Sequence, residues 1–321
     1  MITGAKILIT GVRGSVGLPL ALDLAAENEV WGIARFAEAP PPEDVEAVPW
    51  SRASLEAAGI TTRAIDLGAG DFDDLPDDFT YVLHLAWQRG PLAELEDVLR
   101  TNVEGAGLLL QHCRKARAAL VMSGMGIYSG QNDPWHAYSE TDPVGRGATA
   151  YAATSPASKL GVEAVARFCA RAFDLPTVIT RLNTFMGMPD SFPGRHIAAV
   201  LAGETMFAPH DPNPHTPIHI DDMKDQLEAL LDAAATPALI TNWCGDETVT
   251  AQDWVQRASE LSGREGRLEV RAPAPGSPLG TRADPNRRQS ITGPCRTVFD
   301  DEYRRLFATV SAHARAVGTN G

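Results

Sequence analysis

The sequence predicts an α/β fold in which helices cover both faces of a parallel β-sheet. Two observations indicate this fold. Short apolar runs typical of buried parallel strands alternate with segments whose apolar residues recur at helical spacing. The first run, Lys6–Thr10, passes through a glycine-rich turn directly into such a helical segment. Alternation of this kind builds doubly wound sheets, which bind their ligands at the carboxyl ends of the strands.

The glycine-rich turn has the spacing of a dinucleotide-binding site. Gly11, Gly14 and Gly17 follow the strand in the order G-x-x-G-x-x-G. The first glycine permits a sharp turn, the second lets the backbone approach a pyrophosphate, and the third lets the helix pack closely on the strand. The helix start offers unpaired N–H groups and the positive end of a dipole. We therefore expect a Rossmann-type site here, with Arg13 and Val16 of the turn among its cofactor contacts.

The remaining elements follow in chain order. A long helix is expected over Leu92–Arg117. Ser155 followed by Pro156 is typical of a helix start, and this helix is expected to reach about Phe173. The predicted strands of the first half are Lys6–Thr10, Glu29–Ala34, Thr61–Asp66, Tyr81–Ala86, Ala119–Ser123 and Thr177–Arg181.

The pattern changes beyond residue 183. Thr184–Pro217 is punctuated by glycine and proline and is expected to cover the substrate. We predict a dinucleotide-binding core over residues 1–183 and a smaller, mainly substrate-binding lobe over residues 184–321, with a segment at about 218–245 returning to the core. The further expected elements are a helix from Asp221 or Asp222 to Ala234, strands at Ile240–Cys244 and Leu268–Arg271, and helices at Ala251–Ser262 and Asp300–Ala316.

The second predicted strand ends at Arg35, which bears on the choice of cofactor. Sites that bind NAD place a carboxylate near this point to hold the ribose hydroxyls. A guanidinium suits a 2′-phosphate through forked, charge-assisted hydrogen bonds, and Arg13 is placed to assist. The sequence therefore predicts NADP rather than NAD, the alternative being that Arg35 is a solvated surface arginine.

Composition excludes several classes of partner. The formal net charge is −13, and no basic cluster is present, which argues against nucleic acid and anionic membranes. No apolar run is long enough to cross a bilayer, and the chain enters its first strand without a signal peptide. The four cysteines are widely spaced, as in a cytoplasmic protein with reduced thiols. Four histidines between His196 and His219 are irregularly spaced, so no metal site is expected.

The motifs together resemble those of the extended short-chain dehydrogenase/reductases, in the NAD-dependent epimerase/dehydratase family that contains nucleotide-sugar epimerases and dehydratases. Their order and spacing agree over essentially the whole chain. The resemblance implies a nicotinamide cofactor and a homodimer. It is carried by TGVRGSVG at Thr10–Gly17, HLAW at His84–Trp87, TNVEG at Thr101–Gly105, SGMGIYSG at Ser123–Gly130, SPASKLGVE at Ser155–Glu163, TRLNTFMG at Thr180–Gly187, PIHIDD at Pro217–Asp222 and NWCGDETVT at Asn242–Thr250.

The resemblance also implies a catalytic pair, Tyr-x-x-x-Lys, assisted by a serine or threonine. Lys159 matches the lysine, but Ser155 stands at the tyrosine position and Gly124 at the serine/threonine position, with Ser123 one residue earlier. A serine hydroxyl is far too weak an acid to replace tyrosine directly. Tyr151 is the nearest replacement, and Tyr128 and Tyr138 are alternatives. The expected catalytic residues are Lys159, Ser123, Ser155 and Tyr151.

Further contacts are carried over from the same motifs. Asn183 is expected to contact a ligand or to cap a turn, and Arg288 to meet an anionic substrate or a helix end. Gly124 and Met125 complete the expected substrate contacts. The remaining expected cofactor contacts are Asp66, Leu67, Leu85, Ala86, Trp87, Asn102 and Leu182, with Lys159 itself.

Two functions are compatible with these observations. The first is an NADP(H)-binding oxidoreductase or epimerase-like enzyme that acts on a small polar carbonyl or alcohol. The second is a non-catalytic NAD(P)-binding sensor that lost the catalytic tyrosine. The fold does not choose between them, and the sequence does not identify the substrate.

Overall fold

The computed structural model describes residues 2–36, 51–145 and 153–318. The chain forms two compact units. Unit 1 comprises Met1–Ile127, Tyr151–Arg181 and Lys224–Thr241, and unit 2 comprises Tyr128–Ala150, Leu182–Met223 and Asn242–Gly321. The predicted core, residues 1–183, thus lies mostly in unit 1, whereas residues 128–150 belong to unit 2.

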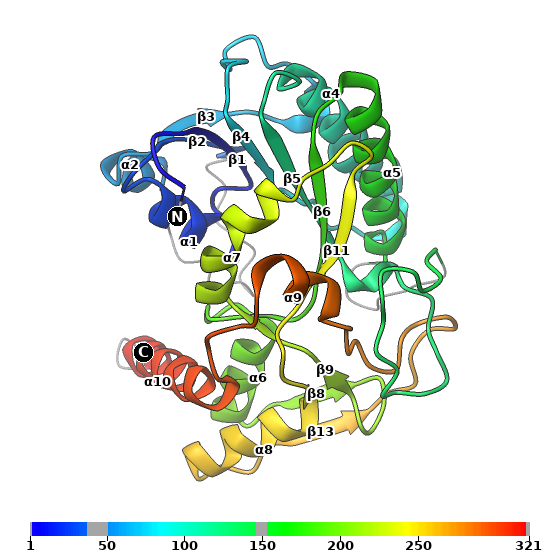
Figure 1. The fold of residues 1–321 in the computed structure, drawn as a ribbon. Helices are drawn as coiled ribbons and strands as arrows, with labels where there is room; N and C mark the ends of the chain where they lie inside the picture. Colours follow the sequence, from blue (N-terminus) through cyan, green and yellow to red (C-terminus); the bar gives the residue numbers. More distant parts are fainter. Residues whose placement is uncertain (1, 37–50, 146–152, 319–321) are drawn as a thin grey trace. The chain divides into compact units, whose positions relative to one another are not determined.

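A seven-stranded sheet with the order β11-β6-β5-β4-β1-β2-β3 forms the centre of the Rossmann-type fold (Figure 1). The pairs on both sides of β1 are parallel, with Thr10 opposite His84 on one side and Ile33 on the other. The predicted α/β fold is therefore confirmed. The strands are β1 (Lys6–Thr10), β2 (Glu29–Ala34), β3 (Thr61–Ala64), β4 (Tyr81–His84), β5 (Ala118–Gly124), β6 (Thr177–Leu182) and β11 (Leu239–Trp243).

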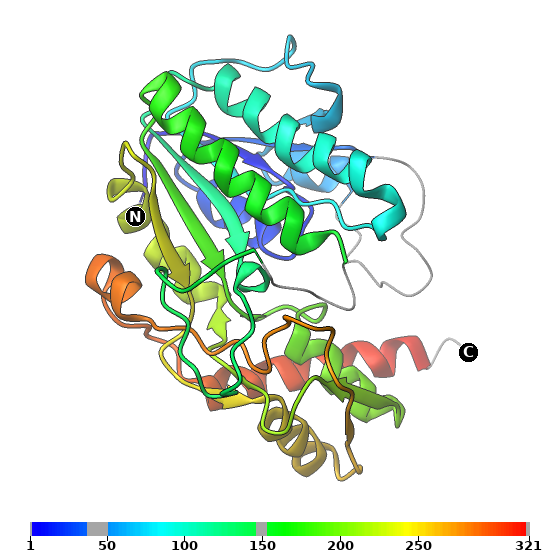
Figure 2. The ribbon, with the colours of Figure 1, turned by 90° about the vertical axis from the view of Figure 1, so that its right-hand side faces the viewer.

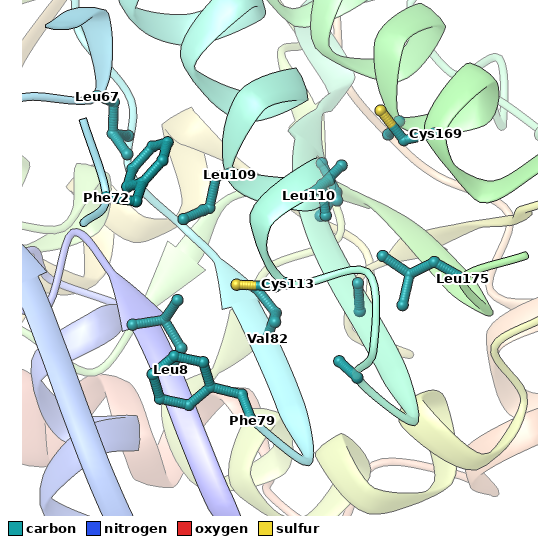
Figure 3. Packing of buried hydrophobic residues seen from close by; sticks show 14 of the residues in the cluster. Leu8, Leu67, Phe72, Phe79, Val82, Leu109, Leu110, Cys113, Cys169 and Leu175 are labelled. Carbon is teal, nitrogen blue, oxygen red and sulfur yellow. The ribbon is translucent and has the colours of Figure 1, made fainter. Parts of the chain in front are cut away.

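Helices cover both faces of this sheet. Helices α4 (Gly105–His112) and α5 (Ser155–Phe173) lie across one face, and α1 (Gly17–Leu24) lies on the other (Figures 1 and 2). Alternate strand residues point to the same face, so one side of the strands supplies the core under α4 and α5. Figure 3 shows Leu8 and Val82 of two strands in this core with Leu109 of α4 and Cys113, which follows that helix.

The long helix predicted over Leu92–Arg117 is wrong as one continuous element. The segment instead contains a 3₁₀ turn at Leu92–Glu94, α3 (Leu95–Leu99), a π-helical turn at Arg100–Glu104, and α4. Gly105 follows the π turn at a close contact, since a Cβ there would lie 2.6 Å from the carbonyl oxygen of Leu67. Periodicity alone does not predict such a bulge, because the segment keeps one buried residue, Asn102, between exposed ends, as a regular helical turn would.

Unit 2 holds short strands, helices and a core of its own. A helix in the segment expected to cover the substrate, α6 (Phe192–Ala202), begins where the Ser191 hydroxyl accepts a hydrogen bond from the Gly194 N–H. Trp254 and Tyr303 are fully buried in the core of this unit. Its elements are β7 (Phe185–Met186), α6, β8 (Thr205–Ala208), β9 (Pro214–His215), β10 (Ile218–His219), the start of α7 (Ile220–Asp232), β12 (Val249–Thr250), α8 (Ala251–Ser262), β13 (Arg267–Val270), α9 (Asn286–Thr292) and α10 (Phe299–Gly318).

The predicted bounds of β1, β2, α5 and α8 agree with the observed ones at both ends, and those of the remaining predicted elements, the long helix apart, differ by at most two residues. A short helix, α2 (Arg52–Ala57), precedes β3. Within the ranges that the structure describes, no helix has the length and apolar character needed to span a membrane.

Candidate functional site

The turn between β1 and α1 is built on close backbone contacts. Gly11 has a φ of +68°, and a Cβ on it would lie 2.8 Å from the Cα of Ala86. A Cβ on Gly17 would lie 2.4 Å from the carbonyl oxygen of Gly11, and a Cβ on Gly14 would lie 3.1 Å from the same atom. Only glycine permits this approach of helix and strand.

The same turn fits the pyrophosphate of a dinucleotide. Within the described part of the chain, the N–H groups of Arg13 and Val16 donate to no acceptor. Arg13 lies in the turn that leads into α1 and Val16 is the N-cap residue of that helix, a place where free N–H groups and the helix dipole favour an anion. The neighbouring strand end is fixed, because the Thr10 hydroxyl accepts hydrogen bonds from the N–H groups of Leu85 and Ala86 at 3.1 and 3.0 Å.

Two guanidinium groups lie beside the turn. Arg35 is exposed at the end of β2, and its Nη1 donates to the Gln88 side chain at 3.3 Å. Phe36 follows with a φ of +45°, and the Arg13 guanidinium lies 5.9 Å from the centre of its ring. Adjacent strands thus bring Arg13 and Arg35 to one region of unit 1, where both are exposed.

Lys159 lies buried on α5, beside the end of β5. Its Nζ donates a 2.7 Å hydrogen bond to the carbonyl oxygen of Met122 and lies 5.0 Å from the centre of the Trp87 ring. The Trp87 indole is linked to α5 by a 3.4 Å hydrogen bond to Ser158. Arg89 lies over the same ring, also at 5.0 Å.

The surroundings of Lys159 disfavour its charged form. Burial lowers its pKa from the usual 10.5 to about 7; Glu163 acts in the opposite sense, and the charge of Arg89 lowers the pKa further. Glu163, one helical turn away, forms a buried two-bond ion pair with Arg181 of β6, at 3.0 and 2.9 Å. A carboxylate neutralised in this way compensates only part of the cost of burying the amine.

Two further polar groups lie on the same face of the sheet. Ser123 follows Ala119 and Val121 along β5, and His84 follows Val82 along β4, so each points to the side that α5 covers. In the described residues, Ser123 Oγ and His84 Nε2 are buried without a hydrogen-bond partner. Buried polar atoms usually have partners, so these two are candidates to contact a ligand.

The protonation of His84 follows from its contacts. Its Nδ1 lies 3.1 Å from the Thr10 hydroxyl, which already accepts two N–H groups and therefore donates its proton to that nitrogen. Burial, assisted by the charge of Lys159, lowers the pKa of His84 to about 3. The ring is therefore neutral, with its remaining N–H at Nε2.

Ser155 is the first residue of α5 and is buried one turn before Lys159. Tyr151 lies outside the described residues. Tyr128 and Tyr138 are buried in unit 2, where the Tyr128 hydroxyl donates to Asn242 at 2.7 Å and the Tyr138 hydroxyl accepts from the N–H of Gln131 at 3.1 Å. Both of these hydroxyls therefore stabilise the fold of unit 2.

Other predicted contacts in unit 1 also have structural partners. Asp66 caps the turn Leu67–Ala69, and Leu67 is buried. The Asn102 side chain accepts from the N–H of Gln88 at 2.8 Å and donates to its carbonyl at 2.9 Å, which fixes the loop after β4. Gly124 ends β5, and Met125 is buried immediately after it. Their predicted ligand contacts stay predictions.

Two residues of unit 2 that were predicted to contact a ligand are held by hydrogen bonds within the protein. The Asn183 side chain, after Leu182, donates to the Thr281 carbonyl at 2.5 Å and accepts from the N–H of Thr184 at 2.6 Å. Arg288 is completely buried; it pairs with Asp246 and donates to the Gly293 carbonyl at 2.7 Å. The side chains of both are held by protein contacts, and their predicted substrate contacts stay predictions.

The histidines of unit 2 take part in structural networks. Trp254 Nε1 donates to His196 at 2.6 Å, while His215 bonds Thr184, Thr281 and Asn213 at 2.7, 2.8 and 2.9 Å. Burial lowers the pKa of His196 to about 4 and that of His215 to about 3. The ranges with described structure contain no group of three or more metal-ligating side chains suited to a metal ion.

The surroundings of Lys159 include residues that the sequence did not single out. Met122 contributes a carbonyl oxygen, which any residue supplies, so no sequence signal marks it. Arg89 also comes near Lys159 only through the tertiary fold, so no local sequence pattern marks it. Lys159 and Glu163 are four residues apart on one helix, and this spacing indicates that their charges interact.

Comparison with solved structures supports the fold. A UDP-glucuronic acid 4-epimerase from Bacillus cereus, in complex with UDP-glucuronic acid and NAD, is similar with a TM-score of 0.80 and 23% identity over 96% of this chain and 99% of the other. A UDP-N-acetylglucosamine 4-epimerase from Methanobrevibacter ruminantium M1 has a TM-score of 0.78 and 15% identity over 97% and 100%. DesIV, a dTDP-glucose 4,6-dehydratase from Streptomyces venezuelae, has a TM-score of 0.77 and 19% identity over 94% and 96%, as a double mutant with NAD bound.

At these identities the likeness shows the fold alone. No curated protein matches the sequence significantly. The model of the NAD dependent epimerase/dehydratase family, however, matches residues 7–233, which include the glycine turn, Lys159 and β6. The resemblance described above is thereby confirmed: the chain belongs to the NAD dependent epimerase/dehydratase family, a family of enzymes.

Proposed function

We propose that the protein is an NADP(H)-dependent oxidoreductase or epimerase that acts on a carbonyl or alcohol carbon of a sugar nucleotide. The observation that carries this proposal is the position of Lys159. It is buried at the end of β5, near Ser123 and two strands from the glycine turn of β1. The solved epimerases and dehydratase of similar fold support the substrate class, since their names specify UDP- and dTDP-sugars.

The residues divide into two groups by role. The turn at Gly11, Gly14 and Gly17 would hold the cofactor pyrophosphate, with Arg13 and Arg35 at a 2′-phosphate. The bound cofactor would supply hydride acceptance and donation, which protein side chains do not provide. Lys159 and Ser123 would orient the reacting hydroxyl or carbonyl and handle its proton.

A non-catalytic NAD(P) sensor is the second candidate, favoured by Ser155 at the tyrosine position. Turnover decides between the two. Purified protein would be incubated with NADP⁺ or NAD⁺ and a panel of UDP- and dTDP-hexoses. Nicotinamide absorbance reports net oxidation, and NMR of the sugar reports epimerised or dehydrated products. Turnover supports the enzyme, and tight cofactor binding without any product across the panel favours the sensor.

The cofactor preference is testable through Arg35. We expect NADPH to bind about ten- to a hundredfold more tightly than NADH, since hydrogen bonds to a charged group contribute about 1.5–3 kcal/mol. Arg35→Ala should remove most of this difference, as measured by calorimetric titration. Arg100→Ala, at an exposed arginine of the same unit, is the control. Equal affinities of the wild type for the two cofactors would contradict the assignment.

A homodimer through α4 and α5 is a further part of the proposal. Phe168 of α5 is 64% exposed and Leu108 of α4 is 44% exposed, although the two helices pack against each other. Large exposed apolar side chains on adjacent helices favour association. We expect a dimer by light scattering and a monomer for Phe168→Glu, whereas Phe207→Glu in unit 2 should leave the dimer intact. A monomeric wild type would contradict this surface.

Cytoplasmic location also stays a prediction. Cys113, Cys169, Cys244 and Cys295 are all free thiols, in keeping with a reducing compartment.

A further inference from the structure

We propose that Lys159 itself, and not a tyrosine, takes and returns the proton of the substrate hydroxyl. This inference rests on the proposed function and names the acid–base group of that same site. In the family pattern, the lysine assists a tyrosine one helical turn earlier. Here that position is Ser155, and the amine is the ionisable group that remains at this turn of α5.

The hydrogen bonding of Nζ leaves it free to react. Among the described residues it makes one hydrogen bond, to the carbonyl of Met122, and it also faces the Trp87 ring. A neutral amine that donates one N–H in this way keeps its lone pair for a proton, and an ammonium in the same place keeps two further N–H groups to donate. A purely structural buried lysine would be expected to have a direct carboxylate partner.

Four charged or titratable groups surround the amine. Glu163 on α5 is held by Arg181 of β6, so its charge is already paired. Arg89, beyond β4, presents a second cation to the Trp87 ring. His84 of β4 is neutral at physiological pH. Burial, with Arg89, therefore makes release of a proton from Lys159 accessible near neutral pH, where a general base works best.

The proton step balances as follows. In the oxidation direction, neutral Nζ takes the proton of the substrate O–H and becomes an ammonium, while the carbon loses its hydride to the oxidised cofactor and becomes a carbonyl. In the reduction direction, the ammonium returns that proton to the oxygen. Ser123, whose hydroxyl has no partner in the described residues, is the positioning residue for the reacting oxygen.

The first test needs neither substrate nor cofactor. The chain has only four lysines, Lys6, Lys115, Lys159 and Lys224, so protein labelled with ¹³C at the lysine ε-carbon gives a small set of NMR signals, and Lys159→Met identifies the relevant one. We expect that signal to titrate near neutral pH, well below the ordinary lysine value of about 10.5. Arg89→Met should move the Lys159 titration to higher pH, because it removes a neighbouring positive charge.

The second test uses turnover. Oxidation should increase as pH rises through the Lys159 titration, and reduction should decrease, because the two directions need the neutral and the charged amine. Lys159→Arg keeps a cation but cannot release its proton, so it should bind cofactor within severalfold of wild type and lose about a hundred- to ten-thousandfold in turnover. Tyr151→Phe should retain most of the activity.

The outcomes are distinguishable. A Lys159 signal that titrates near the ordinary lysine value of about 10.5 overturns the inference even in an active enzyme. Loss of turnover in Tyr151→Phe with activity kept in Lys159→Arg overturns it as well. A Lys159 signal near neutral pH in a protein that converts no member of the panel overturns the proposed function, and the acid–base role with it.

Discussion

Glu163→Ala should lower the free energy of unfolding by about 3–5 kcal/mol, because it removes the carboxylate that pairs with the buried Arg181 guanidinium. The two side chains are only 4% and 5% exposed and form two hydrogen bonds at 3.0 and 2.9 Å. The cost comes mainly from the uncompensated charge, and less from the loss of attraction. Urea denaturation followed by far-ultraviolet circular dichroism measures it.

Two controls separate this effect from a general loss of charge. Asp232→Ala breaks the Arg117–Asp232 pair of the same unit, whose side chains are more than half exposed; we expect a loss of at most about 1 kcal/mol. The double variant Glu163→Met with Arg181→Met removes both charges and should regain most of the stability lost by Glu163→Ala. If the double variant were as unstable as the single one, packing and not charge would explain the loss.

Gly17→Ala should weaken cofactor binding by about a hundredfold. The added Cβ would lie 2.4 Å from the carbonyl oxygen of Gly11, a backbone atom that cannot rotate away. The start of α1 must then move from the strand, and overpacking of this kind costs about 1–3 kcal/mol. The displacement also moves the N–H groups of Arg13 and Val16 away from the pyrophosphate. Calorimetric titration with NADPH measures the affinity.

Gly14→Ala provides a graded comparison, because its Cβ would meet the same oxygen at 3.1 Å. We expect it to leave the unfolding free energy nearly unchanged and to weaken binding only through the closer approach to the ligand. Gly17→Ala should reduce both stability and binding. Equal effects of the two substitutions would show that the distance to Gly11 does not determine the cost.

The sequence predicted the fold where local signals agree with tertiary packing. The apolar run Lys6–Thr10, the three glycines and the Ser155–Pro156 helix start each mark an element that the structure contains. The prediction from sequence failed where a tertiary contact interrupts a local pattern, as at the π turn before Gly105. No element was predicted at α6, although Ser191 followed by Pro193 is a helix-start signal, because the segment was interpreted from its many glycines and prolines.

The site was predictable to a lesser degree. Lys159 could be located by its place in a motif, but its burial and its hydrogen bond to the Met122 carbonyl depend on Trp87, Arg89 and Met122, which lie far from it in sequence. For Asn183 and Arg288, the sequence suggested a ligand contact, and the structure shows partners within the protein. Polar residues at a predicted ligand site are equally suited to bracing loops, and their protein partners become visible only in three dimensions.

The path of the chain between its two units limits how such a protein can be recombined. The chain passes from one unit to the other five times, after Ile127, Ala150, Arg181, Met223 and Thr241. A gene cut near residue 183 would encode a sheet without its edge strand β11, since that strand comes from Leu239–Trp243. Exchange of unit 2 between relatives would require three coordinated grafts. New specificity in such a chain is therefore gained more readily by substitution within existing loops than by joining a ready-made module.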